Sequence, residues 1–167
     1  MDPLESAVDI VTLLVSFGGY IDARLSPRQF AVSPLHFAVS HDSSLIISAL
    51  LSSRLKFPDT VSRALSEDDC PGYTPLLGAI SNRLVSNRCF ECCQLLVEAG
   101  ADVCATPRDW MSGELRASPL EEAVIAPVKD LLQLFLQSPS CQVDKVGSMK
   151  AAPLLLATRH GSIVVVR

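Results

Sequence analysis

Residues 33–40 read SPLHFAVS, and three later segments of the chain repeat this pattern closely. They read TPLLGAIS from Thr74, SPLEEAVI from Ser118 and APLLLATR from Ala152. Each has a small or hydroxyl residue, then Pro-Leu, then two variable residues and an Ala. Similarity that recurs along a chain is the sequence signature of a repeat protein, so we expect a fold built from stacked copies of one unit.

Each copy of this pattern predicts the start of a short first helix. Proline suits the first helical turn, because its missing N–H would lack a partner there in any case. The Ser or Thr before the proline can accept hydrogen bonds from the free amide groups of that turn. The Ala that follows is small enough for a neighbouring helix to approach closely.

A second apolar block follows each copy and predicts a second helix. In VKDLLQLFLQ the apolar side chains form one wide stripe at helical spacing, made by Leu131, Leu132, Phe135 and Leu136. In FECCQLLVEAGADV, Gly100 stands where a helix would end in the left-handed conformation. The N-terminal AVDIVTLLVSFGGYID is a further second block, whose first half is nearly missing.

These units resemble ankyrin repeats, whose pattern is T-P-L-H-x-A followed by a V-V-x-L-L-L-x-x-G-A-D-V second half. The best matches are SPLHFA at 33–38, QLLVEAGADV at 94–103 and ATRHGSIVVV at 157–166. Two units depart from the pattern, because Arg54 and Pro139 occupy the position of the terminal glycine. The resemblance implies an all-α solenoid of stacked helix-turn-helix units with hairpin or loop fingers.

The repeat register divides the chain into about five units within a single ankyrin-type domain over residues 1–167. The expected units are 1–25 (partial), 33–58, 74–104, 118–144 and 152–167 (partial), with insertions near 57–72 and 104–117. The last segment, GSIVVVR, would leave an open apolar face, whereas terminal repeats are expected to be polar caps. We therefore expect the chain to be a fragment or an isoform of a longer array.

Charge and hydropathy argue against several classes of protein. The net charge is −4 and the basic residues are scattered, which disfavours nucleic-acid binding. No apolar run is long enough for a spanning helix, so no membrane insertion is expected. The N-terminus carries Asp2 and Glu5 instead of the positive residues of a secretory signal. We expect an intracellular protein with reduced thiols, with the cytoplasm favoured over the nucleus.

The cysteines of CFECCQLLVEAGADVC at 89–104 raise the question of a metal or redox site. Cys89 and Cys92 have C-x-x-C spacing, but no second pair completes a structural zinc site. In the repeat register, Cys92 and Cys93 take the positions that Leu131 and Leu132 hold in the next unit. Small buried cysteines behave as hydrophobic residues, so we interpret these two as core residues and expect no metal and no cofactor.

The sequence contains no recognisable catalytic motif. No Ser or Cys nucleophile is paired with a base, and the glycines do not form a phosphate-binding loop. His36 occupies the histidine position of the family pattern, and the resemblance implies that it ties adjacent units together by hydrogen bonds. We therefore expect no enzymatic activity and no small-molecule substrate.

Binding of another protein is the function that the resemblance implies, on the surface formed by finger tips and first helices. Trp, Tyr and Arg are favoured at interface hot spots. The candidate protein-binding residues on loops or finger tips are Tyr73, Trp110, Met111, Asp68, Asp69, Arg108 and Arg116. The alternative for Tyr73 and Trp110 is that each packs back onto its own stack.

The expected function is an adaptor, scaffold or substrate-recognition module whose partner is another protein. Two alternatives stay open. In the first alternative, the chain is a regulatory or targeting segment of a larger enzyme or channel. In the second, it is a truncated product without function.

Overall fold

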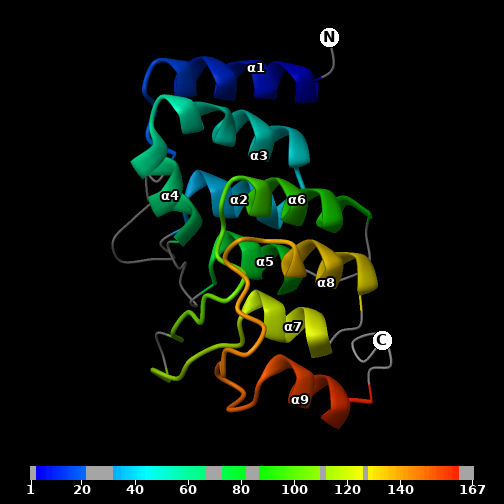
Figure 1. Cartoon of the computed structure of the whole chain (residues 1–167). Coiled ribbons are helices and arrows are strands. Elements are labelled where there is room, and N and C mark those ends of the chain that lie inside the picture. Colours follow the sequence, from blue (N-terminus) through cyan, green and yellow to red (C-terminus); the bar gives the residue numbers. More distant parts are fainter. Residues whose placement is uncertain are drawn as a thin grey trace.

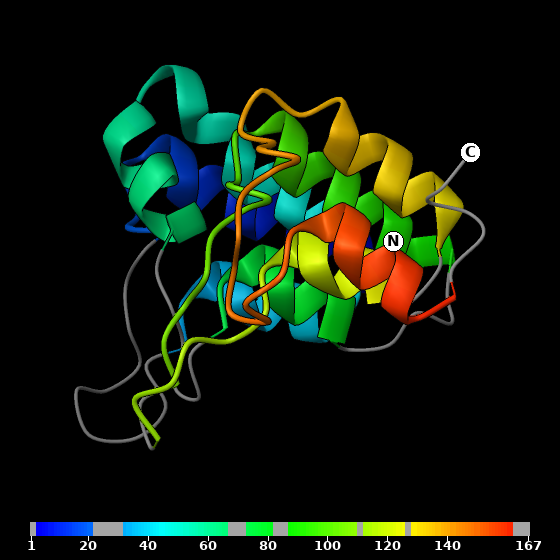
Figure 2. The ribbon, with the colours of Figure 1, turned by 60° about the horizontal axis from the view of Figure 1, so that its bottom comes forward.

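The computed structural model describes residues 3–21, 32–66, 73–81, 87–109, 112–125 and 128–161. Within these ranges the regular structure is helical, which confirms the all-α prediction. Figure 1 shows the helices stacked from α1 at one end to α9 at the other, and Figure 2 shows that most of them lie in two layers. We call one layer the first helices: α2 (Pro34–Ser40), α5 (Pro75–Ser81), α7 (Pro119–Ile125) and α9 (Pro153–Arg159). The other layer holds the second helices: α1 (Pro3–Ser16), α3 (Ser44–Leu51), α6 (Asn87–Glu98) and α8 (Lys129–Leu136).

The first helices begin as the sequence predicts. The hydroxyl before each proline accepts the N–H of the residue three positions on, at Ser33 (3.4 Å), Thr74 (3.2 Å) and Ser118 (3.2 Å). The last first helix, α9, follows Ala152 and has no side-chain cap. Proline in the first turn and a capping hydroxyl therefore set the same starting point in three successive units.

Two second helices end differently, for reasons visible in the sequence. At the end of α6, Gly100 has φ 104° and the Ala101 N–H donates to the Leu96 carbonyl at 3.0 Å, as predicted for a left-handed stop. After α3 no glycine is present. The chain continues into a 3-10 helix, η1 (Ser52–Leu55), and then into α4 (Pro58–Ser66).

The helix α4 belongs to the first predicted insertion. It buries Val61, Ala64 and Leu65 and packs against η1 and α5. The sequence predicted only an insertion here, and the structure shows that this insertion begins with an amphipathic helix.

The core runs continuously between the two layers. The Ala of each first helix is buried, at Ala38, Ala79, Ala123 and Ala157. Cys92 and Cys93 are 1% and 0% exposed and belong to the same core cluster as Leu131 and Leu132, which confirms their interpretation as core residues. Among the described residues, no group of three or more His, Cys, Asp or Glu side chains could hold a metal ion. No helix in the described ranges has both the length and the apolar character needed to span a membrane.

Candidate functional site

Residues 107–109 and 112–116 form the two sides of a narrow finger that leaves the helical stack. The Asp109 N–H donates to the Glu114 carbonyl and the Arg116 N–H donates to the Pro107 carbonyl, both at 2.8 Å. Arg108 and Leu115 pair as an antiparallel bridge between the two sides. Figure 2 shows the described part of this finger, in yellow-green, projecting past the ends of the helices. The second predicted insertion is therefore a hairpin-like projection in its described residues.

Gly113 makes the turn of the finger possible. It has φ 69°, a conformation that side chains other than glycine rarely adopt, and its N–H donates to the Asp109 carbonyl at 2.7 Å. The Asp109 carboxylate supports the same turn, because its Oδ1 accepts the Ser112 N–H at 3.1 Å. The finger thus has internal hydrogen bonds at its described tip as well as along its two sides.

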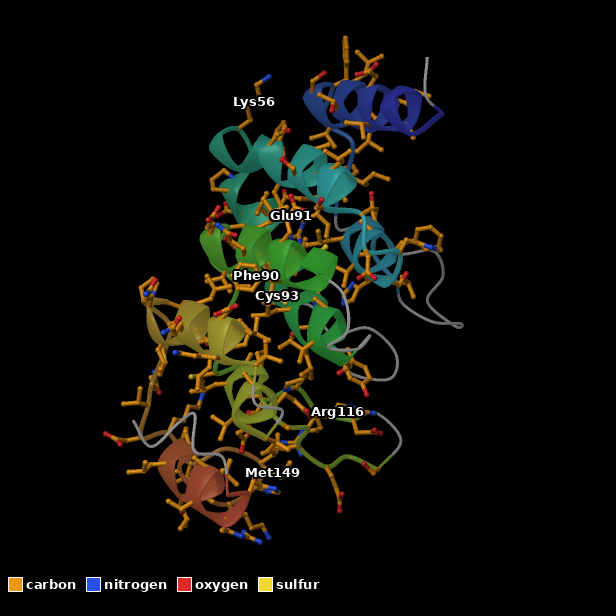
Figure 3. The ribbon with its side chains drawn as sticks, turned by 90° about the vertical axis from the view of Figure 1, so that its right-hand side faces the viewer. Lys56, Phe90, Glu91, Cys93, Arg116 and Met149 are labelled. Carbon is orange, nitrogen blue, oxygen red and sulfur yellow. The ribbon has the colours of Figure 1, made fainter. Side chains whose placement is uncertain are left out.

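A three-residue cluster anchors the finger to the preceding unit. The Arg116 guanidinium lies 4.4 Å from the centre of the Tyr73 ring, and its Nη1 donates to the Tyr73 hydroxyl at 2.9 Å. Its Nη2 donates to Asp109 Oδ2 at 2.5 Å, forming an ion pair. Figure 3 marks Arg116 at the base of the finger. We call Tyr73, Asp109 and Arg116 the finger base.

The finger base is coupled to the stack through Tyr73. The Tyr73 carbonyl accepts the Nε2–H of His36 at 2.8 Å, and the other ring nitrogen of His36 is 2.8 Å from the Ser33 hydroxyl. Because a carbonyl can only accept, Nε2 of His36 carries a proton. The implied role of His36 as a tie between units is confirmed.

The outer side of the finger exposes groups of three chemical kinds. Leu115 is 47% exposed, and Ser112 and Glu114 are also exposed. The exposed Arg108 is held in place, because its Nη1 donates to the Gly113 carbonyl at 2.7 Å. We call Arg108, Glu114 and Leu115 the finger surface. It presents a cation, an anion and an apolar side chain on a short, internally bonded element.

The structure brings together part of the predicted set of binding residues. Tyr73 and Arg116 are in direct contact, and Arg108 lies on the same finger. The other four candidates, Asp68, Asp69, Trp110 and Met111, lie outside the described residues. Their binding role stays a prediction.

Sequence reasoning missed Asp109 and Leu115. A signal for Asp109 was present, because Asp at the start and Gly at the end of DWMSG is a common turn composition. No such signal marks Leu115, whose exposure depends on which side of the finger it lies.

A second buried polar link joins the next pair of units. Glu121 occupies the repeat position of His36 and is 1% exposed. Its Oε2 accepts the Ser118 N–H at 2.8 Å and its Oε1 accepts the Met149 N–H at 3.0 Å. Met149 precedes α9 (Figure 3), so the carboxylate ties α7 to the following unit. This group is engaged inside the stack and is not part of the finger surface.

One comparison with known proteins gives a match. The family model for ankyrin repeats (three copies) matches residues 4–107, which is more than half of the chain. No curated protein matches the sequence.

Proposed function

Because the chain belongs to the ankyrin repeat family, we propose that it is a protein-binding module whose partner docks on the finger surface and finger base. Ankyrin repeats in general mediate protein–protein interactions. The observation that carries the proposal is the anchored finger, in which the Arg116–Tyr73 and Arg116–Asp109 contacts hold exposed Arg108 and Leu115 away from the stack.

The finger is suited to binding for a physical reason. Ordering a flexible loop on binding costs free energy, and a loop that is already hydrogen-bonded avoids much of that cost. A cation, an anion and an apolar group on one such element can discriminate between partners by charge as well as by shape. We propose an adaptor, scaffold or substrate-recognition role, in the cytoplasm, with no reaction carried out by the chain itself.

The test is affinity capture from a native lysate with the tagged 167-residue chain. A finger variant carries Arg108→Glu with Leu115→Asp. A matched control carries Lys56→Glu with Leu136→Asp, a cation and an apolar residue that are also exposed but lie on the second-helix side. All three proteins must first show the same thermal unfolding temperature.

We expect the wild-type chain and the control to enrich the same proteins, and the finger variant to lose them. If the finger variant captured those proteins as efficiently as the wild type, the proposal that the partner binds the finger surface would be wrong.

A further inference from the structure

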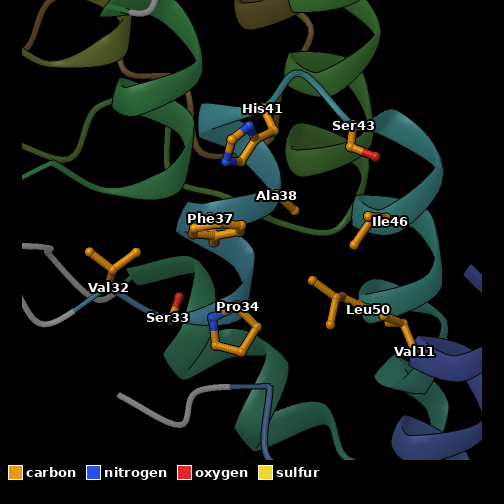
Figure 4. A pocket seen from close by; sticks show the side chains of 10 residues that line it. All are labelled: Val11, Val32, Ser33, Pro34, Phe37, Ala38, His41, Ser43, Ile46 and Leu50. Atoms are coloured by element: carbon orange, nitrogen blue, oxygen red, sulfur yellow. The ribbon is translucent and has the colours of Figure 1, made fainter. Parts of the chain in front are cut away.

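An open apolar groove of about 750 Å³ lies between α1, α2 and α3 (Figure 4). Apolar side chains such as Phe37 and Leu50 face it, and the polar side chains in its lining are Ser33, His41 and Ser43. Among the described residues that line this groove, none carries a thiol or a carboxylate. Reactive side chains that the proposed function does not use lie elsewhere, in the turns that follow α6 and α8.

The turn after α6 and the turn after α8 lie against each other. The Val103 N–H donates to the Ser140 hydroxyl at 3.2 Å, and this hydroxyl donates to the Ala101 carbonyl at 3.4 Å. The Lys145 ammonium donates to the Cys104 carbonyl at 2.9 Å. Figures 1 and 2 show the two segments, in green and orange, side by side. Hydrogen bonds between residues far apart in sequence therefore fix one turn against the other.

Two cysteines lie at this contact, Cys104 in the first turn and Cys141 in the second, and both are free thiols. The Gln142 N–H donates to Cys104 Sγ at 3.2 Å, and the Cys104 thiol is 3.9 Å from the Gln142 carbonyl oxygen. Because the Gln142 nitrogen is bonded to the carbonyl carbon of Cys141, Cys104 Sγ lies directly beside the Cys141 backbone. The two cysteines are 37 positions apart, but the stacked turns make them neighbours.

The two thiols differ in exposure. Cys104 is 3% exposed, whereas Cys141 is partly exposed, so a small oxidant in solution reaches Cys141 first. Burial raises the pKa of the Cys141 thiol above its ordinary value of 9.0, and the charge of Cys104 and a hydrogen bond with it raise the pKa further. Cys141 is therefore mainly protonated at neutral pH, which fits a resting state with both thiols reduced.

We propose that Cys104 and Cys141 form a reversible disulfide when the protein meets hydrogen peroxide, and that this bond locks the turn after α6 to the turn after α8. The Cys141 thiolate attacks one peroxide oxygen. An S–O bond forms as the O–O bond breaks, which leaves a sulfenic acid and one water. The Cys104 thiolate then attacks the Cys141 sulfur, and the S–S bond forms as the S–O bond breaks, releasing a second water.

The atoms and electrons of this reaction balance. The two thiols together lose two electrons and two protons, and the peroxide takes up both and becomes two waters. An excess of a small thiol reverses the reaction by thiol–disulfide exchange. In a reducing compartment such a bond is therefore transient and responds to oxidation.

The reduced structure is close to what the bond requires. A disulfide has an S–S distance of about 2.0 Å, and two thiols already in hydrogen-bond contact reach it by a small movement. The partly exposed Cys141 has room for that movement. The bond would involve neither the finger surface nor the finger base, so it goes beyond the proposed function and holds or fails independently of it.

The test is peptide mapping of the full chain without reduction, before and after treatment with a stoichiometric amount of hydrogen peroxide. Free thiols are alkylated before the protein is denatured, so that exchange cannot create new pairs. Cleavage after Lys, Arg and Glu places Cys104 in peptide 99–108 and Cys141 in peptide 130–145, each without another cysteine. The expected product is these two peptides joined, with two hydrogens fewer than their sum.

Three variants accompany the wild-type chain. Cys104→Ser and Cys141→Ser each remove one partner of the bond, and Cys89→Ser is the control because it removes a cysteine outside the proposed pair. Circular dichroism verifies that each reduced variant is folded. Using two separate serine variants keeps the test valid if the buried Cys104 does not tolerate the change.

We expect the joined peptides to be the main cross-link in the wild type and in Cys89→Ser, and to disappear after dithiothreitol. The oxidised wild type should unfold about 5–10 °C above the reduced protein, because the bond restricts the unfolded chain. Peroxide should give no such increase in Cys104→Ser or Cys141→Ser. The proposal is wrong if peroxide leaves both thiols open to alkylation, if cross-links to other cysteines predominate, or if the unfolding temperature of the cross-linked protein is unchanged.

Discussion

One position of the repeat holds side chains of three different kinds in this chain: an imidazole, an apolar group and a carboxylate. His36, Leu77, Glu121 and Leu155 occupy it in successive first helices. The buried carboxylate of Glu121 is accommodated because three donors surround it: the Ser118 and Met149 amides and the Ser148 hydroxyl, which is 3.4 Å from Oε2. A buried charge without such partners would be strongly destabilising. Glu121 therefore has a structural role, and its replacement should lower the free energy of unfolding.

Replacing Glu121 by Leu, the residue of the α5 unit, should destabilise the protein by about 2–4 kcal/mol, because the Ser118 and Met149 amides lose their acceptor in a buried site. Urea unfolding followed by circular dichroism measures this change. The control Glu114→Leu, on the exposed finger, should stay within about 0.5 kcal/mol of the wild type. Equal effects of the two substitutions would show that the buried hydrogen bonds contribute nothing.

Gly147 is required by its approach to the same carboxylate. A Cβ at Gly147 would lie 2.5 Å from the carboxyl carbon and both oxygens of Glu121. We expect Gly147→Ala to cost about 1–3 kcal/mol, since the carboxylate is held by its hydrogen bonds and cannot move away cheaply. In a Glu121→Ala background the same substitution should cost at least about 1 kcal/mol less. A double-mutant cycle with additive effects would rule out this steric explanation.

Glu122 makes stability depend on pH in a defined direction. Burial and the charge of neighbouring Glu121 raise the pKa of Glu122 above its ordinary value of 4.5. The folded protein then holds this proton more readily than the unfolded chain, so stability falls as pH rises through the interval above 4.5. Because Glu122 is only half-buried, solvent screening keeps the effect small.

Glu122→Gln should therefore stabilise the protein at pH 7, by no more than about 0.5 kcal/mol, and should have no effect near pH 4, where the carboxyl is protonated. Thermal unfolding at both pH values measures the difference, with Glu114→Gln as the exposed control. If Glu122→Gln stabilised the protein more at pH 4 than at pH 7, the raised pKa of Glu122 would be contradicted.

At the scale of the element, the finger depends on one side chain. Arg116 contacts the Tyr73 ring, the Tyr73 hydroxyl and the Asp109 carboxylate, and the ion pair is partly exposed. Exposed ion pairs contribute little to global stability. The consequence of losing Arg116 is therefore expected in the local order of the finger and not in the stability of the whole stack.

For Arg116→Gln we expect amide hydrogen exchange of residues 107–116 to speed up about 5–30-fold, corresponding to a local loss of about 1–2 kcal/mol. The thermal unfolding temperature should change little. Arg108→Gln is the control, because the hydrogen bond from Arg108 to the Gly113 carbonyl lies within the finger and does not reach the stack. Unchanged exchange in Arg116→Gln would mean that the finger is held by its backbone alone.

The sequence predicted best what local chemistry determines. The capping residues, the Gly100 stop and the burial of Cys92 and Cys93 follow from residue type and repeat register. The finger base could not be predicted in this way. It joins Tyr73 to Arg116, which are 43 positions apart, and no local sequence pattern indicates that contact. The helix α4 was not predicted for a similar reason, since its apolar face packs on α5, which lies outside the predicted insertion.

At the scale of the whole molecule, each helix packs against the corresponding helix of the next unit. The second helices contact one another in the order α1, α3, α6 and α8, and the first helices in the order α2, α5, α7 and α9. Repeat stacks of this kind owe their stability to these nearest-neighbour interfaces as much as to the units themselves. The unit boundaries and the number of units stay predictions from the repeat register.

Because the interfaces are continuous, we expect the 167-residue chain to unfold in one cooperative transition. Circular dichroism and tryptophan fluorescence of the single Trp should give coincident urea curves. Separate transitions, or aggregation without a cooperative step, would favour the alternative that the chain is a truncated product without function.

The central claim is that a partner protein binds the finger. Hydrogen exchange of the chain, with and without a protein recovered by affinity capture, tests it most directly. We expect the partner to slow exchange in residues 107–116 and around Tyr73, and to leave α3 and α8 unchanged. Protection confined to the second helices, with exchange in the finger unaltered, would contradict the claim.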